Sequence, residues 1–499
     1  MKYTNPVIPG FYPDPSVCRV DEDYYLVNSS FAYFPGVPIW HSKDIVNWRQ
    51  VGHCLTRESQ LQLEGSPISG GIYAPTLRYH KERYYMVTTN VDHGGHFYVW
   101  AHDPSGEWSD PIYVEQAGID PSIFFDDDGK VYFTSTGAVQ SKGIYQCEID
   151  IETGQKLSET RLIWTGTGGA FPEGPHHYKV NGYYYLMCAE GGTEYGHMVT
   201  IARSDNPYGP YESAPINPIL SHRSLHHPIH ATGHADLIEA HDGKWWAVFL
   251  GIRPVGYPYR HHLGRETFLA PVHWTEDGWP IIGNNGIVDL EMEATGLPLV
   301  PWVDDVEVDH FEYQELGLKW SFIRSAKQVD WSLTEKPSYL ALRGSNAGLD
   351  DPGTPAFIGC RQRHWNCDIS TSLQYRPQEG DEAGLAIYMD ERHYYTIALT
   401  IRNGERVIAL CKHIGSMKIV KHSIPVSDAE VELKIKAVAE TYQFYYKSLD
   451  ETWQLLGDAE TQFVSTEVAG GFTGVFFGLY NQSLETTAYF DWFRYSIKD

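Results

Sequence analysis

Short strand-like runs dominate the hydrophobic and polar pattern of this chain, and helical periodicity is scarce. Five of the runs are rich in aromatic residues and follow a turn signal such as Asn-Gly or Asp-Gly. These runs are Tyr24–Asn28, Tyr84–Thr89, Val131–Ser135, Tyr183–Cys188 and Trp245–Leu250. Asn-Gly and Asp-Gly tolerate the positive φ angles of tight hairpin turns. The pattern therefore predicts five β-hairpins in the first part of the chain.

Each predicted hairpin begins with a polar or proline-flanked residue, which we call its anchor. The anchors are Asp14, Ala74, Asp120, Glu173 and His234. Successive anchors lie 46 to 61 residues apart, which is the spacing of propeller blades. Because the innermost strands of a propeller line one channel, equivalent positions in successive blades converge. We therefore predict a five-bladed β-propeller over residues 1–300, with two Asp, one Glu and one His at one mouth of its channel.

A second region follows the segment Leu297–Trp302, whose two prolines favour an extended connector. The sequence beyond it predicts short strands separated by Gly-rich turns. These strands are Ala383–Met389, Tyr394–Ile401, Val407–Lys412, Val431–Ala437, Tyr442–Lys447, Val475–Tyr480 and Thr487–Ile497. Such spacing is typical of a β-sandwich. We therefore expect an all-β chain, in which a jelly-roll-like β-sandwich over residues 305–499 follows the propeller.

Length and charge narrow the classes of protein to which the chain can belong. A chain of 499 residues is expected to form two or three domains. Its net charge of −26 argues against nucleic acid or an anionic membrane as a partner. No apolar run is long enough to predict a membrane span, and the first residues lack the apolar core of a signal peptide. A homo-oligomer is compatible with the sequence, which does not fix the oligomeric state.

The seven cysteines are odd in number, scattered along the chain and without a CxxC pair. This arrangement is typical of buried free thiols in a reducing compartment and not of a disulfide framework. We therefore expect a cytoplasmic protein.

Two anchors carry an aspartate in the same Asp-Pro-Ser context, namely Asp14 and Asp120. A lone aspartate in such a context is as often a turn residue as a functional one. Its repetition at equivalent positions favours function, because both carboxylates would then face one axis. Prolines on both sides of Asp14 also stiffen the backbone that carries it.

Glu173 lies in a loop that is rich in Gly and Pro, two residues after Phe171. Taken alone, a glutamate in a loop is more often simply exposed. Partial burial and a neighbouring carboxylate would raise its pKa, which suits a general acid near neutral pH. Three carboxyls without an evident Ser or Cys nucleophile motif indicate acid–base hydrolysis, and cleavage of a glycosidic bond needs this equipment.

His234 ends a stretch with four histidines in nine residues, a density that suggests a metal site. The stretch lacks the spacing of a zinc-binding helix, and only His234 stands at an anchor position. With mostly oxygen neighbours, a hard cation such as calcium suits that axis better than zinc. The run Asp126–Gly129 could also hold calcium, but a hairpin turn is preferred because the spaced ligands of a calcium loop are missing.

Arg265 follows the fifth predicted hairpin. Its guanidinium could orient a sugar hydroxyl or pair with the anchor carboxylates. An ion pair with its neighbour Glu266 is the plainer alternative, and the sequence leaves both open.

Together these segments resemble glycoside hydrolase family 43, in particular its two-domain β-xylosidase and α-L-arabinofuranosidase branch. The resemblance covers nearly the whole chain and rests on GFYPDPS, FPGVPIWHSKDIVNW, GGIYAPTLRYH, GIDPSIFFDDDG, PEGPHHY, TGHAD and LGRETFLAPV. It implies a five-bladed propeller with a C-terminal β-sandwich. It also implies an exo-acting, inverting hydrolase that releases xylose and/or L-arabinofuranose from xylo-oligosaccharides or arabinoxylan fragments.

The resemblance also implies a role for each candidate residue. Asp14 would be the general base, Glu173 the general acid, and Asp120 the carboxylate that orients Glu173 and tunes its pKa. Arg265 and His234 are expected beside the non-reducing-end sugar. The chemistry requires no cofactor, but some relatives hold calcium in the channel near the histidine that matches His234. A calcium ion held by His234, partly through water, is therefore an expectation to test.

Two aromatic residues are expected at the same sugar. Phe31 matches an aromatic residue of the family's sugar site. Tyr73 departs from the pattern, because many β-xylosidase relatives carry Trp there, so the sequence does not decide between xylose and arabinofuranose. The sandwich of such relatives often helps to close the site, but the sequence does not identify the residue that would do so.

Three other functions fit parts of the pattern. A lectin-like propeller would bind oligosaccharides without cleaving them. A retaining, fructan-acting propeller enzyme would need a nucleophile motif of the NDPN type, which the sequence lacks. A glycoside phosphorylase would depend on added phosphate.

Overall fold

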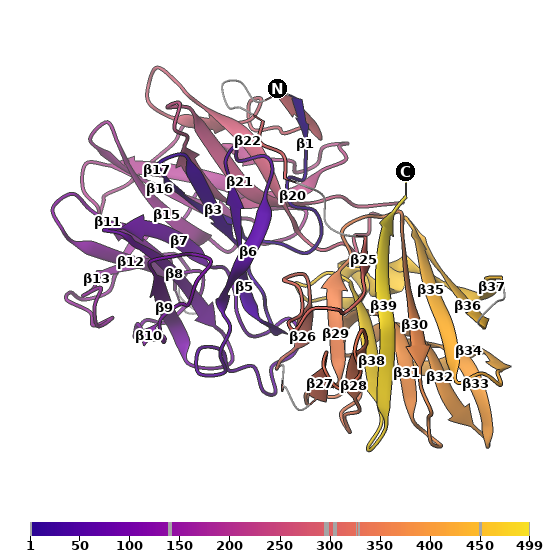
Figure 1. Cartoon of the computed structure of the whole chain (residues 1–499). Coiled ribbons are helices and arrows are strands. Elements are labelled where there is room, and N and C mark those ends of the chain that lie inside the picture. The colour runs from indigo at the N-terminus through magenta and orange to yellow at the C-terminus, as the bar shows by residue number, and fades with distance from the viewer. Residues whose placement is uncertain are drawn as a thin grey trace.

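The computed structural model describes residues 2–137, 142–293, 299–302, 307–325, 327, 330–448 and 452–498. In these residues the chain is built almost entirely of strands, arranged as two domains side by side (Figure 1). The first domain carries five small antiparallel sheets of four or five strands, besides one two-stranded sheet, and the second carries two sheets of eight strands each. This arrangement confirms the all-β fold that the sequence predicts, with a five-bladed propeller followed by a β-sandwich.

The five small sheets are the propeller blades, and they follow one another along the chain. The first blade contains β2 (Ser16–Val20), β3 (Asp23–Val27), β5 (Gly36–Ser42) and β6 (Arg49–Leu55), and the second contains β7 (Thr76–His80), β8 (Arg83–Asn90), β9 (Gly95–Ala101) and β10 (Ile112–Tyr113). The third contains β11 (Ser122–Phe125), β12 (Val131–Thr136), β13 (Ile144–Glu148) and β14 (Arg161–Trp164), and the fourth contains β15 (Glu173–Val180), β16 (Tyr183–Glu190), β17 (Met198–Ser204), β18 (Glu212–Ser213) and β19 (Leu220–Ser221). The fifth contains β20 (His230–Glu239), β21 (Trp245–Ile252), β22 (Glu266–Trp274) and β23 (Pro280–Ile282).

The first strands of the blades form the inner ring of the propeller. Strand β2 contacts β7, β7 contacts β11, β11 contacts β15, β15 contacts β20, and β20 returns to β2. Each anchor stands at or just before one of these strands, apart from His234, which lies within β20. The ring therefore brings the beginnings of five hairpins, far apart in sequence, around one axis.

The aromatic runs become the second strands of the blades, β3, β8, β12, β16 and β21. The turns before them have the expected backbone, with φ of 51° at Asn181 and 85° at Gly182. The run Asp126–Gly129 is also a hairpin turn, in which Gly129 N–H donates to the Asp126 carbonyl. Lys179 and the Tyr184 hydroxyl donate to the Asp126 carboxylate. The turn interpretation of this run is therefore the correct one.

The N-terminal segment ties the propeller closed. Strand β1 (Lys2–Thr4) pairs with β24 (Glu291–Glu293), and Ile8 pairs with Thr267 of the last blade. The side-chain amide of Asn5 donates to the Leu269 carbonyl and accepts from the Leu269 N–H. The buried side-chain amide of Asn5 therefore joins the start of the chain to the fifth blade through two buried hydrogen bonds.

The predicted connector lies against the first blade. The Val300 N–H donates to the Asp44 carboxylate, and the Trp302 indole N–H donates to the Asn47 carbonyl. Leu297, Pro298 and the predicted start of the second domain at residue 305 lie outside the described residues.

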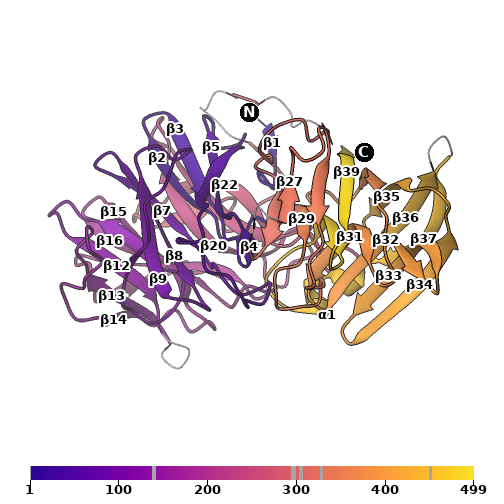
Figure 2. The same ribbon diagram turned by 60° about the horizontal axis from the view of Figure 1, so that its bottom comes forward.

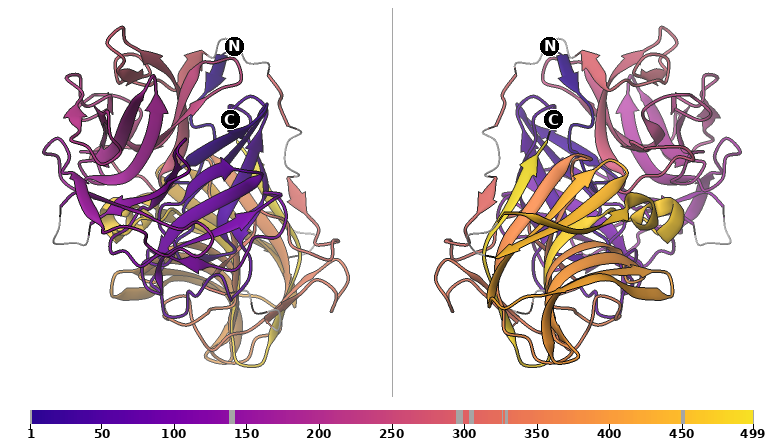
Figure 3. Two further views of the ribbon diagram at one scale, coloured as in Figure 1. Left: turned by 90° about the vertical axis from the view of Figure 1, so that its left-hand side faces the viewer. Right: turned by 90° about the vertical axis from the view of Figure 1, so that its right-hand side faces the viewer.

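The second domain stacks its two large sheets as a sandwich (Figures 2 and 3). One sheet contains β25 (Val308–Asp309), β27 (Trp331–Ser332), β28 (Leu340–Arg343), β39 (Thr487–Ile497), β30 (Cys367–Gln374), β35 (Glu430–Val438), β36 (Thr441–Ser448) and β37 (Gln454–Glu460). The other contains β34 (Met417–Pro425), β33 (Glu405–Ile414), β32 (His393–Arg402), β31 (Glu382–Asp390), β38 (Phe476–Gln482), β29 (Phe357–Arg361), β26 (Ser321–Ile323) and β4 (Tyr33–Phe34). A short 3-10 helix, η2 (Thr461–Val464), and a one-turn helix, α1 (Thr466–Ala469), precede β38.

The two sheets of the sandwich differ in what covers their outer faces. Strand β35 alternates between buried Leu433 and Ile435 and more exposed residues, as expected for a sheet with one face in water. Strand β31 is buried on both faces. Leu385 and Ile387 face the sandwich core, whereas Ala386 belongs to a cluster shared with the propeller. The outer face of this sheet is therefore the interface between the domains.

The interface is continuous with the sandwich sheet. Strand β4 comes from the propeller part of the chain but pairs with β26, so that Tyr33 lies opposite Ile323. The side chain of Arg361 donates to the Phe11 carbonyl, and its guanidinium lies 4.4 Å from the Tyr12 ring centroid. The second domain is thus fixed on the segment that immediately precedes Asp14.

All seven cysteines are buried and free, as the sequence predicts. In the described part of the chain, no helix is long and apolar enough to cross a bilayer.

Candidate active site

Three anchors share an unusual backbone conformation. Asp14, Asp120 and His234 have φ values of 52°, 53° and 48°, in the left-handed region that few non-glycine residues adopt. In the fourth blade this conformation falls on Gly174, with φ of 55°, one residue after Glu173. A Cβ atom at Gly174 would lie 2.8 Å from His234 Nε2, so only glycine fits there. Glu173 is therefore offset by one residue from the strict equivalent of Asp14.

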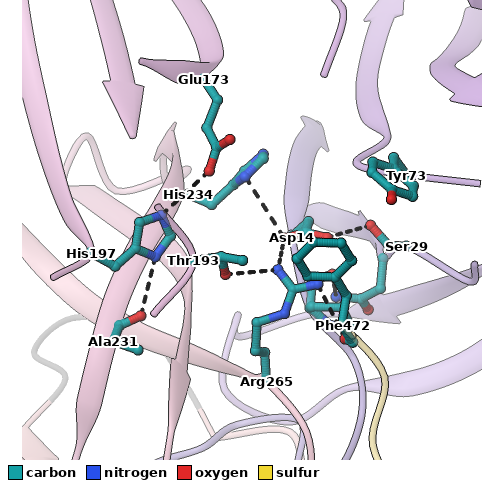
Figure 4. Close-up of polar contacts among 12 residues, drawn as sticks. Asp14, Ser29, Tyr73, Glu173, Thr193, His197, Ala231, His234, Arg265 and Phe472 are labelled. Atoms are coloured by element: carbon teal, nitrogen blue, oxygen red, sulfur yellow. Dashed lines mark hydrogen bonds and ion pairs between the residues drawn. The ribbon is translucent and has the colours of Figure 1, made fainter. Parts of the chain in front are cut away.

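Asp14 is buried and held by three side chains (Figure 4). Arg265 Nη1 donates to its Oδ1 at 2.9 Å, and Ser29 Oγ donates to its Oδ2 at 2.5 Å. His234 Nδ1 lies 3.7 Å from Oδ1. Burial alone would raise the pKa of Asp14, but Arg265, His234 and the Ser29 hydrogen bond together hold this pKa below its usual value. Asp14 is therefore a carboxylate at neutral pH.

Arg265 pairs with Asp14 and not with its neighbour in sequence. Glu266 instead accepts two hydrogen bonds from Arg253, at 2.7 and 2.8 Å. Arg265 also donates to Thr193 Oγ1 at 3.0 Å and to the Phe472 carbonyl at 3.4 Å. Of the two alternatives that the sequence left open, the structure shows the pairing with an anchor carboxylate.

Asp120 and Glu173 form a second, differently charged part of the site. Burial, followed by repulsion from Glu173 and Asp14, raises the pKa of Asp120 well above its usual range. Burial and repulsion from Asp14 raise the pKa of Glu173 to about 7, and Arg265 opposes this rise. Two carboxyls that repel each other in a buried site do not both ionise, so the pair holds a proton at neutral pH.

Aromatic rings line one side of the site. The Phe31 ring lies 5.2 Å from that of Tyr73 and 6.1 Å from that of Phe472, between centroids. The Arg265 guanidinium lies 5.7 Å from the Phe31 ring centroid and 5.8 Å from that of Phe472. The Tyr73 hydroxyl donates to the Ser69 carbonyl. These rings and the guanidinium form a wall that suits the apolar face and hydroxyls of a sugar.

Phe472 belongs to the sandwich domain, and the sequence did not single it out. The propeller holds the backbone of Phe472 in place, because the Phe472 N–H donates to Ser69 Oγ at 2.9 Å. Its only sequence signal is an aromatic residue in a Gly-rich turn, which is too common to indicate a site. Thr193, Ser29 and the buried His197 were also missed, although all three contact predicted site residues (Figure 4).

A second buried carboxylate lies among the same innermost strands. Arg78 donates to both oxygens of Asp236, at 2.8 and 3.2 Å. Ser16 Oγ and the Tyr178 hydroxyl each donate to this carboxylate at 2.6 Å. Arg78 also donates to His176 Nδ1 at 2.9 Å. Burial alone would raise the pKa of Asp236, but Arg78, His176 and these hydrogen bonds hold it below its usual value.

The donor set around His234 does not fit the expected calcium ion. Calcium takes six to eight oxygen ligands. In the described ranges, no group of three or more His, Cys, Asp or Glu side chains could hold a metal ion. Asp236, the carboxylate nearest to His234 in sequence, is paired with Arg78, whose guanidinium already supplies a buried positive charge. The calcium expectation stays a prediction, and the donor set argues against it.

Known proteins resemble this chain in sequence over both domains. The family model described as Glycosyl hydrolases family 43 matches residues 3–280, and the one described as Beta xylosidase C-terminal Concanavalin A-like domain matches residues 308–496. A non-reducing end alpha-L-arabinofuranosidase of Bacteroides ovatus is 46% identical, with 100% of this chain and 95% of the relative covered. A xylosidase/arabinosidase of Butyrivibrio fibrisolvens is 37% identical, with 99% of each covered.

Solved structures agree with this likeness. The Bacteroides ovatus protein described as Xyloglucan PUL GH43B superimposes with a TM-score of 0.96 at 44% identity, over 100% of both chains. The xylan beta-1,4-xylosidase from Bacillus halodurans superimposes with a TM-score of 0.95 at 36% identity, over 99% of this chain and 100% of the other. The arrangement of propeller and sandwich is thus shared with proteins that cleave glycosides.

Proposed function

The chain belongs to glycosyl hydrolases family 43, and from that premise we propose that it is an exo-acting, inverting hydrolase of xylo-oligosaccharides or arabinoxylan fragments. It would release xylose and/or L-arabinofuranose from the non-reducing end. The names of the relatives support this substrate class, since one is a non-reducing end alpha-L-arabinofuranosidase and another a xylosidase/arabinosidase. Membership of the family sets aside the lectin-like and fructan-acting alternatives.

In this proposal the carboxyls divide the proton transfers of an inverting mechanism. Asp14 is the general base that takes a proton from the attacking water. Glu173 is the general acid that protonates the departing glycosidic oxygen. Asp120 orients Glu173, and repulsion between the two carboxyls keeps one proton on the pair. Inversion needs the acid and base to flank the sugar with room for water between them.

One observation carries the proposal: two carboxyls of one buried site have pKa values shifted in opposite directions. The Arg265 guanidinium and the Ser29 hydroxyl keep Asp14 ionised against the effect of its burial. Burial and the charge of Asp14 raise the pKa of Glu173 to about 7. An acid and a base are thereby available together near neutral pH, which is the usual sign of a divided acid–base pair.

The wall of the site supports exo action on a small sugar. Phe472 reaches the site from the sandwich and shares Arg265 with the propeller, so the second domain closes one side. A site that is closed on one side can bind the end of an oligosaccharide chain, whereas binding its middle would need both sides open. Tyr73 has a smaller ring than the Trp of many β-xylosidases, and its hydroxyl donates to the Ser69 carbonyl, so the proposal includes both sugars.

A cytoplasmic location is part of the proposal. Seven buried free thiols without a disulfide are typical of proteins kept in a reducing compartment. The homo-oligomer stays a prediction, which sedimentation of the purified protein would check.

Hydrolysis of synthetic glycosides tests the proposal directly. The enzyme is incubated with 4-nitrophenyl β-D-xylopyranoside and 4-nitrophenyl α-L-arabinofuranoside, with and without phosphate. We expect release of nitrophenol from at least one glycoside, independent of phosphate. Proton NMR of an unlabelled xylo-oligosaccharide digest should show that the first sugar formed has the inverted anomeric configuration. A first product with retained configuration would contradict the mechanism, and phosphate dependence would favour a phosphorylase.

A further inference from the structure

His197 is a buried histidine next to the proposed acid, and its ring has one fixed tautomer. It precedes β17 and has a fully buried side chain. Its Nδ1 lies 3.2 Å from the Ala231 carbonyl, which can only accept, so Nδ1 carries the proton and donates. Burial, and then the neighbouring His234, lower the pKa of His197 to about 3. The ring is therefore neutral, and its Nε2 presents a lone pair.

This lone pair has no hydrogen-bond donor among the described residues. Glu173 Oε1 lies 4.0 Å from Nε2 (Figure 4). An ionised Glu173 would place a second set of lone pairs opposite the first, which is unfavourable in a buried site. A protonated Glu173 could instead donate its O–H to Nε2 after a small rotation, and would satisfy a buried acceptor that otherwise costs free energy.

Asp120, the other member of the coupled pair, has the opposite environment. It accepts a hydrogen bond from the Gly174 N–H, an interaction that favours its carboxylate. Asp14 raises and Arg265 lowers the pKa of both Asp120 and Glu173, so neither charge distinguishes the two. The proton shared by the pair is thus drawn away from Asp120 by a donor and toward Glu173 by an acceptor.

We propose that His197 is a positioning residue that assigns the shared proton of the Asp120–Glu173 pair to Glu173. The inference rests on the proposed role of Glu173 as general acid, because the proton must lie on that carboxyl before substrate binds. His197 acts through Glu173 and need not touch the sugar.

The sequence around His234 makes room for this histidine. A Cβ atom at Gly233 would lie 2.3 Å from two atoms of the His197 ring, so any larger residue would displace it. Gly174 plays the same part for the His234 ring, as described above. The two glycines thus leave space for the rings of His197 and His234 close to the backbone.

The test replaces the lone pair while keeping the ring. In His197→Phe, the Glu173 carboxyl signal is followed against pH by carbon-13 NMR of protein labelled at glutamate, and Glu173→Gln identifies the signal. We expect the midpoint of the Glu173 titration to fall by about 0.5 to 1 pH unit, the effect of losing one ordinary hydrogen bond. The basic limb of kcat/KM for an alkyl glycoside should fall by the same amount, because Glu173 would ionise at lower pH.

A matched control separates this effect from loss of a buried imidazole. His96 is buried, its Nδ1 contacts Thr89, and its ring packs edge-on to Phe133. Within the part of the chain that the structure describes, its Nε2 has no hydrogen-bond partner. His96→Phe should leave the Glu173 titration unchanged. An unchanged titration in His197→Phe would overturn the inference, as would an equal shift in both variants.

A second measurement covers the case in which His197→Phe does not fold. Nitrogen-15 NMR of unaltered enzyme labelled at histidine should show an unprotonated His197 Nε2 whose signal moves as Glu173 ionises and is constant in Glu173→Gln. A constant signal in the unaltered enzyme would contradict the inference. Failure of the proposed function would look different, since Glu173→Gln would then turn over substrate normally while the NMR titrations still report on His197.

Discussion

Two buried carboxylate clusters lie among the innermost strands of one propeller, and their charges are balanced differently. At one, Asp236 faces the guanidinium of Arg78, and two hydroxyls and the Val17 N–H also donate to its carboxylate. At the other, Asp14, Asp120 and Glu173 share the single guanidinium of Arg265. The first cluster has one negative charge for one positive charge, whereas the second has three carboxyls for one cation.

The difference shows why similar strand positions give rigidity in one place and chemistry in the other. A buried carboxylate with a complete set of donors has a lowered pKa, and it stabilises the fold at neutral pH. Where buried carboxyls outnumber the nearby cations, some of them must stay protonated, because ionising them all in a buried site is unfavourable. Their pKa values are therefore raised. Hydrolysis needs a carboxyl that is still protonated near pH 7, so the unbalanced cluster is the one suited to act on a substrate.

The largest expected effect is on turnover, at the unbalanced cluster. Glu173→Ala should lower kcat/KM for a natural oligosaccharide by about 10²- to 10⁴-fold, the usual contribution of a general acid. A nitrophenyl glycoside should be affected much less, because its leaving group needs little protonation. Steady-state kinetics on both substrates check this, and circular dichroism confirms that the variant is folded. An equal loss on both substrates would contradict the acid role of Glu173.

The next largest effect is on stability, at the balanced cluster. Asp236→Asn leaves the Arg78 guanidinium buried without its counter-charge, and should lower the free energy of unfolding by about 3–5 kcal/mol. Thermal and urea unfolding of the propeller transition measure this loss. Asp127→Asn is the control, because that carboxylate also pairs with a cation, Lys179, but is exposed. A loss at Asp236 no larger than at Asp127 would show that the two clusters do not differ as described.

The two clusters should also respond to pH in opposite senses. The pKa of Glu173 is raised to about 7 in the folded state, so the stability gained by holding its proton is lost as pH rises toward 7. Glu173→Gln removes this loss, and at pH 8 the variant should be more stable than the unaltered enzyme by about 1–3 kcal/mol, with a smaller difference at pH 5.

Unfolding midpoints at both pH values, with the exposed Glu194→Gln as control, check this prediction. Asp236 has a lowered pKa, so its contribution to stability is present above the pKa of an unfolded aspartate and is lost only in acid. If the unaltered enzyme and Glu173→Gln were equally stable at pH 8, the unbalanced cluster would not destabilise the fold, and the comparison of the two clusters would be wrong.

The repeated hairpins made much of the site predictable from sequence. Because each blade repeats a turn and an aromatic strand, Asp14, Asp120 and His234 could be placed at equivalent positions before any contact was known. The offset of Glu173 was not predictable, because it follows from the space that the His234 ring needs beside Gly174. The local pattern thus predicted the ring of anchors, but not the one-residue offset of Glu173.

Contacts between distant parts of the chain could not be predicted in this way. Strand β4 leaves the propeller to join the sandwich, and Phe472 returns from the sandwich to the site. Neither segment has a local sequence pattern that predicts its position, because contacts with the other domain determine that position. The partnership of Arg78 with Asp236 likewise depends on how two blades lie beside each other. The calcium expectation at His234 was made without knowledge of this buried guanidinium, and it stays a prediction.

The smallest expected effect concerns that cation. Because Arg78 supplies a buried positive charge beside Asp236, and no suitable donor set surrounds His234 in the described residues, removal of calcium should change nothing measurable. Enzyme treated with EDTA and then given calcium should keep the same kcat/KM and the same midpoint of thermal unfolding. Elemental analysis of the purified protein gives an independent readout. Stoichiometric calcium, or an unfolding midpoint that rises when calcium is added, would show that the balanced cluster is not complete and that the channel needs a second cation beside Arg78.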